Sequence, residues 1–367
     1  MSSDVILVIV IGTALAFDFT NGFHDTANVS ATAISTRAIA PRPAVLLASL
    51  LNFVGAFISL KVAATVGQAF VDIHAVTATA VFAGLIGAIG WNLLTWYVGL
   101  PSSSSHALIG GLVGSVWAAE GSQAVSASGL LDKLIVPALV APLIAFAAAG
   151  LTILIVYRIV GRLRPGPVNR GFRLGQLGSG GLLALSHGTN DAQKTMGVIT
   201  LALVAHGSIS ATHFNVPPWV VLTSAAAIAL GTFSGGWRII RTMASRTIKL
   251  DPPQGFAAQT AGAAVILAAS GLGYPLSTTH VISGGITGAG AAKHFSAVRW
   301  GGTGNIVVAW LLTLPAAAAG GAAVYGITTL FGRGAAGPIV VSAVLLALLA
   351  VVLLRRQAHA APNPVGA

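Results

Sequence analysis

Two short acidic motifs in apolar surroundings are the parts of this sequence best suited to chemistry. NGFHDTAN at 21–28 contains Asp25, and HGTNDAQK at 187–194 contains Asp191. A carboxylate in the hydrocarbon core of a membrane costs several kcal/mol, roughly 2.5 to 3.5 on insertion scales, so each must be compensated by a ligand or a proton. Two such residues in similar motifs indicate a binding site rather than two helix caps.

Amide side chains accompany both carboxylates. Asn21 and Asn28 flank the first, and Asn190 directly precedes the second. Carboxylate and amide oxygens together suit Na⁺ or another hard cation, and a carboxylate alone can hold a proton. Lys194 could supply a positive charge to an anion or pair with one of the aspartates. Asp18 is a further candidate, but it has no counterpart in the second motif.

Two Ser/Thr runs follow these motifs, at 101–106 (PSSSSH) and 275–280 (PLSTTH). Proline disfavours helix for the residue before it, and Ser or Thr is a preferred N-cap, so a helix should begin within or just after each run. A helix N-terminus in the membrane interior presents free N–H groups and a positive dipole end, which favours a small tetrahedral oxyanion. The candidate hydroxyls are those of Ser103, Ser104, Ser105, Ser277, Thr278 and Thr279.

Histidines end both runs. His106 and His280 could relay protons or contact the anion, although a buried histidine more often donates to a neighbouring carbonyl. We assign no site role to His24 or His187. The tryptophans at 91, 96, 300 and 310 are interpreted as interfacial anchors or packing residues.

The chain repeats itself. Residues 99–114 and 273–288 share seven identities in sixteen positions at a constant offset, including proline, serine and histidine. The acidic motifs also align with each other, and each half has the order acidic motif, two apolar segments, Ser/Thr run. We therefore predict two inverted structural repeats with interrupted, re-entrant helix hairpins, as secondary transporters have.

Composition places the chain in a membrane. Charged residues make up 7% of the 367 positions and hydrophobic residues 55%, too few charges to cover a water-soluble fold of this size. We predict an all-α polytopic protein with about ten hydrophobic segments, whose 45 glycines allow close helix packing. The absence of cysteine excludes disulfides and thiolate chemistry. The main apolar stretches are 5–17, 43–66, 76–98, 133–157, 174–205, 218–240, 255–272, 303–328 and 337–354.

The net charge of +11 reflects topology rather than a nucleic-acid partner. Most Lys and Arg residues lie in five breaks between apolar segments, around 37–42, 158–173, 238–249, 293–299 and 355–356. Successive crossings place all five on one face, which the positive-inside rule makes cytoplasmic. We predict a first repeat at 1–158, a cytoplasmic basic linker at 159–173, a second repeat at 174–354 and a cytoplasmic tail at 355–367.

At these motifs the sequence resembles the PiT family of inorganic phosphate transporters, in its bacterial low-affinity branch. The matching stretches are 21–28, 101–106, 186–191 and 275–280, in the family's order and spacing. The resemblance implies symport of phosphate with H⁺ or Na⁺ in the bacterial cytoplasmic membrane, without a cofactor, with phosphate often carried as a neutral metal complex. It implies cation or proton sites at the two acidic motifs and phosphate contacts at the hydroxyls, and it is compatible with a homodimer.

The first motif departs from the Na⁺-type pattern of that family. His24 stands where the pattern has asparagine, whereas Asn190 keeps it in the second half. The loss of an amide ligand favours H⁺ as the coupling ion.

Three alternatives stay open on the sequence. A sulfate permease would keep the fold and carry another tetrahedral oxyanion. An intramembrane hydrolase could use Ser103 and His106, but the duplicated Ser and His at 277 and 280 have no evident use in an enzyme, and no Gly-x-Ser-x-Gly or His-Glu-x-x-His motif occurs. A channel is disfavoured because paired buried carboxylates suit a carrier that must neutralise its anion.

Overall fold

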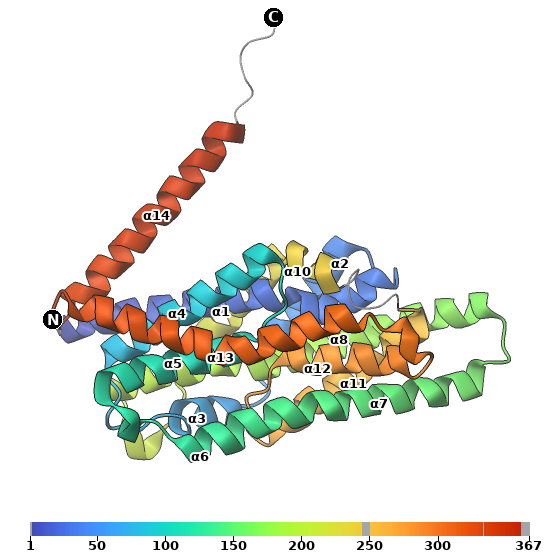
Figure 1. Ribbon diagram of the computed structural model, residues 1–367, viewed down its shortest axis with the longest axis horizontal. Coiled ribbons are helices and arrows are strands. Elements are labelled where there is room, and N and C mark those ends of the chain that lie inside the picture. Colours follow the sequence, from blue (N-terminus) through green and yellow to red (C-terminus); the bar gives the residue numbers. More distant parts are fainter. Residues whose placement is uncertain (1, 244–249, 333, 361–367) are drawn as a thin grey trace, which may run out of the picture.

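A computed structural model describes residues 2–243, 250–332 and 334–360, which form a bundle of α-helices (Figure 1). Within these residues the only β-type pairing is an isolated bridge between Val71 and Val125. The α-helices are α1 (Ser2–Ser35), α2 (Pro41–Gly55), α3 (Lys61–Gln68), α4 (Ala78–Val98), α5 (Ser104–Glu120), α6 (Ala127–Leu130), α7 (Val136–Val160), α8 (Pro165–Ala205), α9 (Pro218–Ser234), α10 (Trp237–Thr242), α11 (Pro252–Gly271), α12 (Thr278–Ala291), α13 (Trp300–Thr329) and α14 (Ala336–Ala360).

Proline and glycine set many of the helix boundaries. Pro41, Pro165, Pro218 and Pro252 open α2, α8, α9 and α11, where the missing N–H costs nothing because the first turn has no intrahelical acceptor for it. Gly99 ends α4 with φ of 72°, a left-handed conformation that favours glycine. The chain can therefore turn sharply before α5.

Two helix hairpins enter the bundle from opposite ends. In Figure 1, α4 and α5 lie toward the end that holds the N-terminus, and α11 and α12 lie toward the other end. Their tips meet inside the bundle, where the Ser105 hydroxyl donates to the Leu276 carbonyl at 2.9 Å. Each hairpin packs against a helix from the other half of the chain. α5 lies against α13, and α12 lies against α7.

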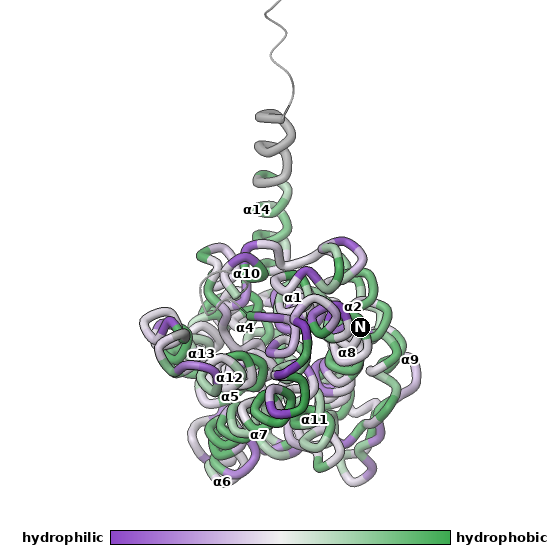
Figure 2. Tube along the Cα trace, turned by 90° about the vertical axis from the view of Figure 1, so that its right-hand side faces the viewer, coloured by the Kyte–Doolittle hydropathy of each residue, from purple (hydrophilic) through white to green (hydrophobic). Residues whose placement is uncertain are grey.

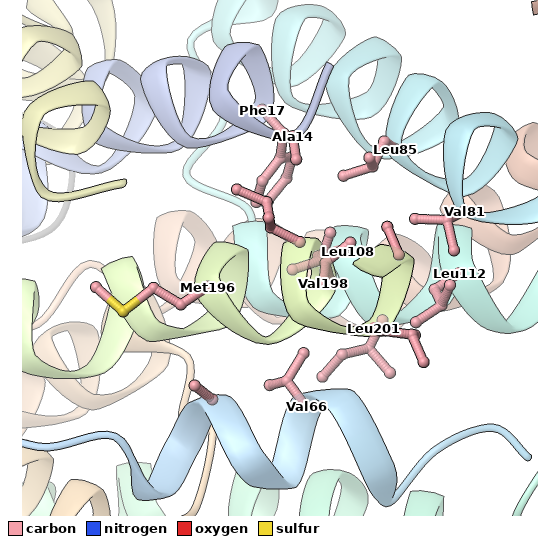
Figure 3. Close-up of a cluster of buried hydrophobic side chains, with 14 of the residues drawn as sticks. Ala14, Phe17, Val66, Val81, Leu85, Leu108, Leu112, Met196, Val198 and Leu201 are labelled. Carbon is pink, nitrogen blue, oxygen red and sulfur yellow. The ribbon is translucent and has the colours of Figure 1, made fainter. Parts of the chain in front are cut away.

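Two apolar clusters hold the bundle together. One contains Val10, Ala14 and Phe17 of α1 with residues of α3, α4, α5, α8 and α9, and part of it is drawn in Figure 3. The other contains Ala27 and Val29 of α1 with residues of α2, α7, α8, α11 and α12. One end of α1 and of α8 packs in the first cluster and the other end packs in the second. The buried polar residues of the acidic motifs lie at the transition between these two ends. The protein therefore has a polar layer with apolar packing on either side.

Close glycine packing is confirmed where helices cross. A Cβ atom at Gly111 of α5 would overlap the backbone carbonyl of Gly84 in α4, and one at Gly188 of α8 would overlap that of Asn52 in α2. Larger side chains at these positions would push the helices apart.

The helices of the structure differ in detail from the predicted apolar stretches. The stretches 43–66 and 218–240 are each divided into two helices, α2 with α3 and α9 with α10. Hydropathy does not detect the first break, which is largely apolar, and the second is made by Gly235, in a left-handed conformation with φ of 73°, and Gly236. The expected linker at 159–173 is mostly helical, since α7 runs to Val160 and α8 begins at Pro165.

Four helical stretches are long and apolar enough to cross a membrane in the described part of the chain: Ser3–Ser35, Ala78–Val98, Ala127–Val160 and Trp300–Thr329. The described part of α14 projects away from the bundle (Figure 2). Residues 244–249 of a basic break predicted to be cytoplasmic, and 361–367 of the predicted tail, lie outside the described residues.

Candidate functional site

The two acidic motifs meet inside the bundle. Asp25 of α1 and Asp191 of α8 are 2% and 0% exposed, and these two helices pack against each other. One ligand atom from each aspartate and one from His187 all lie within 4.8 Å of one another. The aspartates therefore belong to one buried site, as their common sequence pattern suggests.

Asp25 is bound by both hairpin tips. Its Oδ2 accepts a hydrogen bond from Ser104 Oγ of α5 at 2.8 Å and a longer one from Thr278 Oγ1 of α12 at 3.4 Å. Its Oδ1 lies 2.7 Å from Nδ1 of His24. A single carboxylate thus joins α1 to the first turns of two helices that come from opposite ends of the bundle.

Lys194 forms the second connection. Its buried Nζ donates to Asp191 Oδ1 at 2.7 Å, to the Leu276 carbonyl at 2.8 Å and to Ser105 Oγ. All three protons of the ammonium are used, and the acceptors come from α8 and both hairpin tips. Of the two roles considered for Lys194, the structure shows the ion pair with Asp191.

The amides differ in how far they are satisfied. Asn28 donates to Thr279 Oγ1 at 2.9 Å and to Thr278 Oγ1 at 3.3 Å, so it orients the second hydroxyl run. Asn190 donates to Ser270 Oγ at 2.8 Å and to a backbone carbonyl at 3.0 Å, but its Oδ1 has no partner among the described residues.

Asn21 is buried and neither of its amide atoms has a hydrogen bond within the described part of the chain. Both oxygens of Asp18 and the hydroxyl of Thr195 are also buried without a close hydrogen bond among the described residues, and the Asn21 and Thr195 side chains lie near the Asp18 carboxyl. Buried polar atoms without partners are costly, so a group of oxygens of this kind is available to a hard cation or to a proton.

The six predicted hydroxyls divide into two roles. Ser103 and Ser277 are the N-caps of α5 and α12, accepting from the backbone N–H of His106 at 3.1 Å and His280 at 3.4 Å. This confirms that helices begin within the two runs. The other four hydroxyls, those of Ser104, Ser105, Thr278 and Thr279, contact the aspartate, lysine and amide groups of the site.

The histidines that follow the hydroxyl runs face each other. The rings of His106 and His280 meet edge to face with centroids 4.8 Å apart, and His280 stacks on Trp310 at 4.0 Å. Neither imidazole is hydrogen bonded to Asp25 or Asp191 in the described structure. A role for these histidines in proton or phosphate contact therefore stays a prediction.

Two histidines to which the sequence analysis gave no role belong to the site. His24 lies against Asp25 and is 3.2 Å from Thr95 Oγ1, and His187 Nε2 lies 3.3 Å from Asp191 Oδ2. The spacing of four residues between His187 and Asp191 places both on one helical face, a signal that the sequence carried. The contact between Thr95 and His24 depends on how α4 packs against α1, and no spacing reveals it.

A buried site made by helix ends that enter a polytopic bundle from opposite sides is typical of secondary transporters. Comparison with known proteins agrees: the Phosphate transporter family matches residues 21–168 and 163–321. The chain belongs to this family, and it is a multi-pass membrane transporter rather than an enzyme.

Similar proteins span most of the chain. A probable low-affinity inorganic phosphate transporter of Mycobacterium bovis is 53% identical over 327 residues, which cover 89% of this chain and 78% of that protein. One of Rhizobium meliloti is 51% identical over 314 residues, 85% of this chain and 93% of that protein. A solved structure described as the sodium-dependent phosphate transporter superposes with a TM-score of 0.78 at 26% identity, covering 89% of this chain and 99% of that one.

Proposed function

We propose that this protein imports inorganic phosphate across the bacterial cytoplasmic membrane in symport with a cation. The observation that carries the proposal is the convergence of both hairpin tips on one carboxylate, since Ser104 and Thr278 both donate to Asp25. Membership of the Phosphate transporter family and the similarity to probable phosphate transporters support phosphate over sulfate as the cargo.

The hydroxyls and helix ends would bind the anion. α5 and α12 both begin at the site, so their first-turn N–H groups and the four hydroxyls that face the polar layer provide donors for phosphate oxygens. A proton on phosphate needs an acceptor, which Asp25 can supply.

Charge explains why a cation must accompany phosphate. The ionised side chains of Asp25, Asp191 and Lys194 carry a net charge of −1, and an ionised Asp18 would make it −2. Adding an anion to this buried group is unfavourable at low dielectric unless protons or cations enter with it. Coupling then follows from the composition of the site.

We propose H⁺ as the coupling ion. The contact between His24 and Asp25 at 2.7 Å places a second titratable group beside the carboxylate that contacts both hairpins. Na⁺ is the second candidate, supported by the unpartnered oxygens of Asp18 and Asn21 and by the sodium-dependent relative. A divalent metal would travel as part of the cargo, as a neutral phosphate complex.

Alternating access would use the two repeats at 1–158 and 174–354. The two matched stretches of the family divide the chain at 163–168, within the predicted junction, which supports this division. The hairpins enter from opposite ends, so a shift of either one would open the site toward its own end of the bundle.

Uptake into proteoliposomes tests the proposal. We expect concentrative uptake of radiolabelled phosphate when the outside solution is more acidic than the lumen. Separate experiments apply a Na⁺ gradient or a Mg²⁺ gradient, or replace phosphate by labelled sulfate. Asp25→Asn and Asp191→Asn should abolish coupled uptake, whereas Asp132→Asn, an exposed control, should not. Sulfate uptake without competition by phosphate would refute the cargo, Na⁺ dependence without pH dependence would refute the proton, and near-normal concentrative uptake in both aspartate variants would refute their role.

A further inference from the structure

A cavity lies beside the candidate phosphate site and opens on the apolar surface of the bundle. It has a volume of about 750 Å³ and is lined by residues of α7, α12 and α13 and by His106 of α5. Its rim carries apolar side chains that are exposed on the bundle surface, including Leu139 (59%), Leu143 (68%) and Leu311 (66%). The bilayer covers such a surface, so a molecule dissolved in the lipid can reach the cavity. Its volume lies within the range of small-molecule sites, about 300 to 1,000 Å³.

Unsatisfied polar atoms line this cavity. His106 Nε2, Ser283 Oγ, Trp310 Nε1 and one ring nitrogen of His280 are buried and lack a hydrogen bond within the described residues, while the other His280 nitrogen is within reach of the Ala138 backbone. The two histidines and Ser283 are at least nine-tenths buried. One unsatisfied atom is a common cost of packing, but four around one cavity indicate that a bound molecule supplies their partners.

The chemistry of these atoms defines the occupant. The described lining contains no Asp, Glu, Lys or Arg, so a charged head would have no counter-ion. The Trp310 indole can only donate a hydrogen bond, and the Ser283 hydroxyl can both donate and accept. A neutral imidazole donates from one ring nitrogen and accepts at the other. A matching head group is uncharged and both donates and accepts, as a hydroxylated head does. The remaining apolar wall suits an aliphatic chain.

We propose that this cavity binds a single-chain membrane lipid with an uncharged hydroxylated head, such as a monoacylglycerol. The chain would lie between α7 and α13, and the head would contact His106, His280, Ser283 and Trp310. His106 directly follows Ser105 on α5, and His280 directly follows Thr279 on α12. The bound head would therefore touch the first turns of the two helices that contact Asp25, which gives membrane lipid a means to modulate transport.

Photolabelling of the full chain in nanodiscs tests the site. The probe is a monoacylglycerol with a diazirine in its chain, and labelled peptides are mapped by mass spectrometry. We expect labels in α7, α12 and α13 that unlabelled monoolein displaces. Methyl oleate, whose head only accepts, should compete about fivefold or more weakly, the loss expected for one hydrogen bond of typical strength.

Two conservative variants probe the head contacts. Ser283→Ala removes the hydroxyl, and Trp310→Phe removes the indole N–H while keeping a ring to stack on His280. Each should weaken labelling about fivefold, which is the loss in affinity expected when one hydrogen bond is removed. Trp219→Phe on α9 is the matched control and should leave labelling unchanged. Thermal unfolding in detergent identifies any variant that fails to fold, and the wild-type competition series stands independently of the variants.

Three results would overturn the proposal. They are labels spread evenly over the lipid-facing surface, equal competition by methyl oleate and monoolein, and cross-links that show a second copy of the chain filling the cavity. None of these measurements uses transport, so failure here would leave the phosphate proposal untouched.

Discussion

Replacing Lys194 by methionine should destabilise the fold strongly while preserving side-chain volume. The ammonium donates all three protons, to Asp191, Ser105 and the Leu276 carbonyl, and it is fully buried. After Lys194→Met, the one compensating group that Asp191 keeps among the described residues is His187, at 3.3 Å.

The magnitude follows from these contacts. Removing one member of a buried ion pair costs about 3 to 5 kcal/mol, because the other charge stays buried and unpaired. The two neutral acceptors add about 0.6 kcal/mol each, the average for a side-chain hydrogen bond between membrane helices. The expected loss in free energy of unfolding is therefore about 4 to 6 kcal/mol.

A double-mutant cycle separates the ion pair from the rest. Asp191→Asn alone leaves the ammonium uncompensated and should cost about 3 to 5 kcal/mol. The double variant Lys194→Met/Asp191→Asn buries no charge of this pair, so it should be more stable than the sum of the single losses predicts, with a coupling energy of about 3 kcal/mol. Equilibrium unfolding in mixed SDS micelles, followed by far-ultraviolet circular dichroism, measures all four proteins.

Lys61 provides a matched control. Its Nζ also donates to a backbone carbonyl, that of Gly271 at 2.9 Å, but the side chain is exposed. Lys61→Met should therefore cost less than about 1 kcal/mol. Strict additivity of the two single variants, to within about 0.5 kcal/mol, would refute a coupled buried pair at Lys194 and Asp191.

Three further changes test the fold and the site. Gly188→Val should prevent α8 from packing against α2 and abolish the folded protein in detergent, measured by size-exclusion chromatography, whereas Gly178→Val in the same helix has open space and should fold. Thr278→Val removes a hydroxyl that contacts the site and should raise the KM of uptake about fivefold or more, the cost of a hydrogen bond; an unchanged KM would exclude Thr278 from the substrate site. Asp251→Ala removes the side-chain cap of α11, which accepts from the Gln254 backbone N–H, and also the contacts of that carboxylate with Tyr157 and Lys293, so the free energy of unfolding should fall by at least about 1 kcal/mol, and no loss would mean that the cap is not used.

The sequence was most informative where local chemistry decides the structure. A proline followed by hydroxyls predicts a helix start, and α5 and α12 begin within the two runs with Ser103 and Ser277 as N-caps. Matching motifs predicted that Asp25 and Asp191 act together, and their ligand atoms lie within 4.8 Å of each other.

Features that depend on packing between distant segments could not be predicted. Lys194 bonds the Leu276 carbonyl, which is 82 positions away, and no spacing rule indicates which acceptor a buried lysine reaches. The break between α2 and α3 is made largely of apolar residues, so hydropathy along the sequence did not indicate that the helix ends there. The cavity beside His280 results from the separation of three helices, which sequence patterns do not reveal.

The packing of each hairpin against the other half of the chain has a consequence for biosynthesis. The ribosome delivers α5 and α7 to the membrane well before α13 and α12, the helices against which they pack. The first half of the chain must therefore wait in the bilayer with two helices lacking their main partners until nearly all of the second half has been made. Halves produced as separate polypeptides should consequently assemble only when they are synthesised together, because each half supplies the helices against which the other half packs.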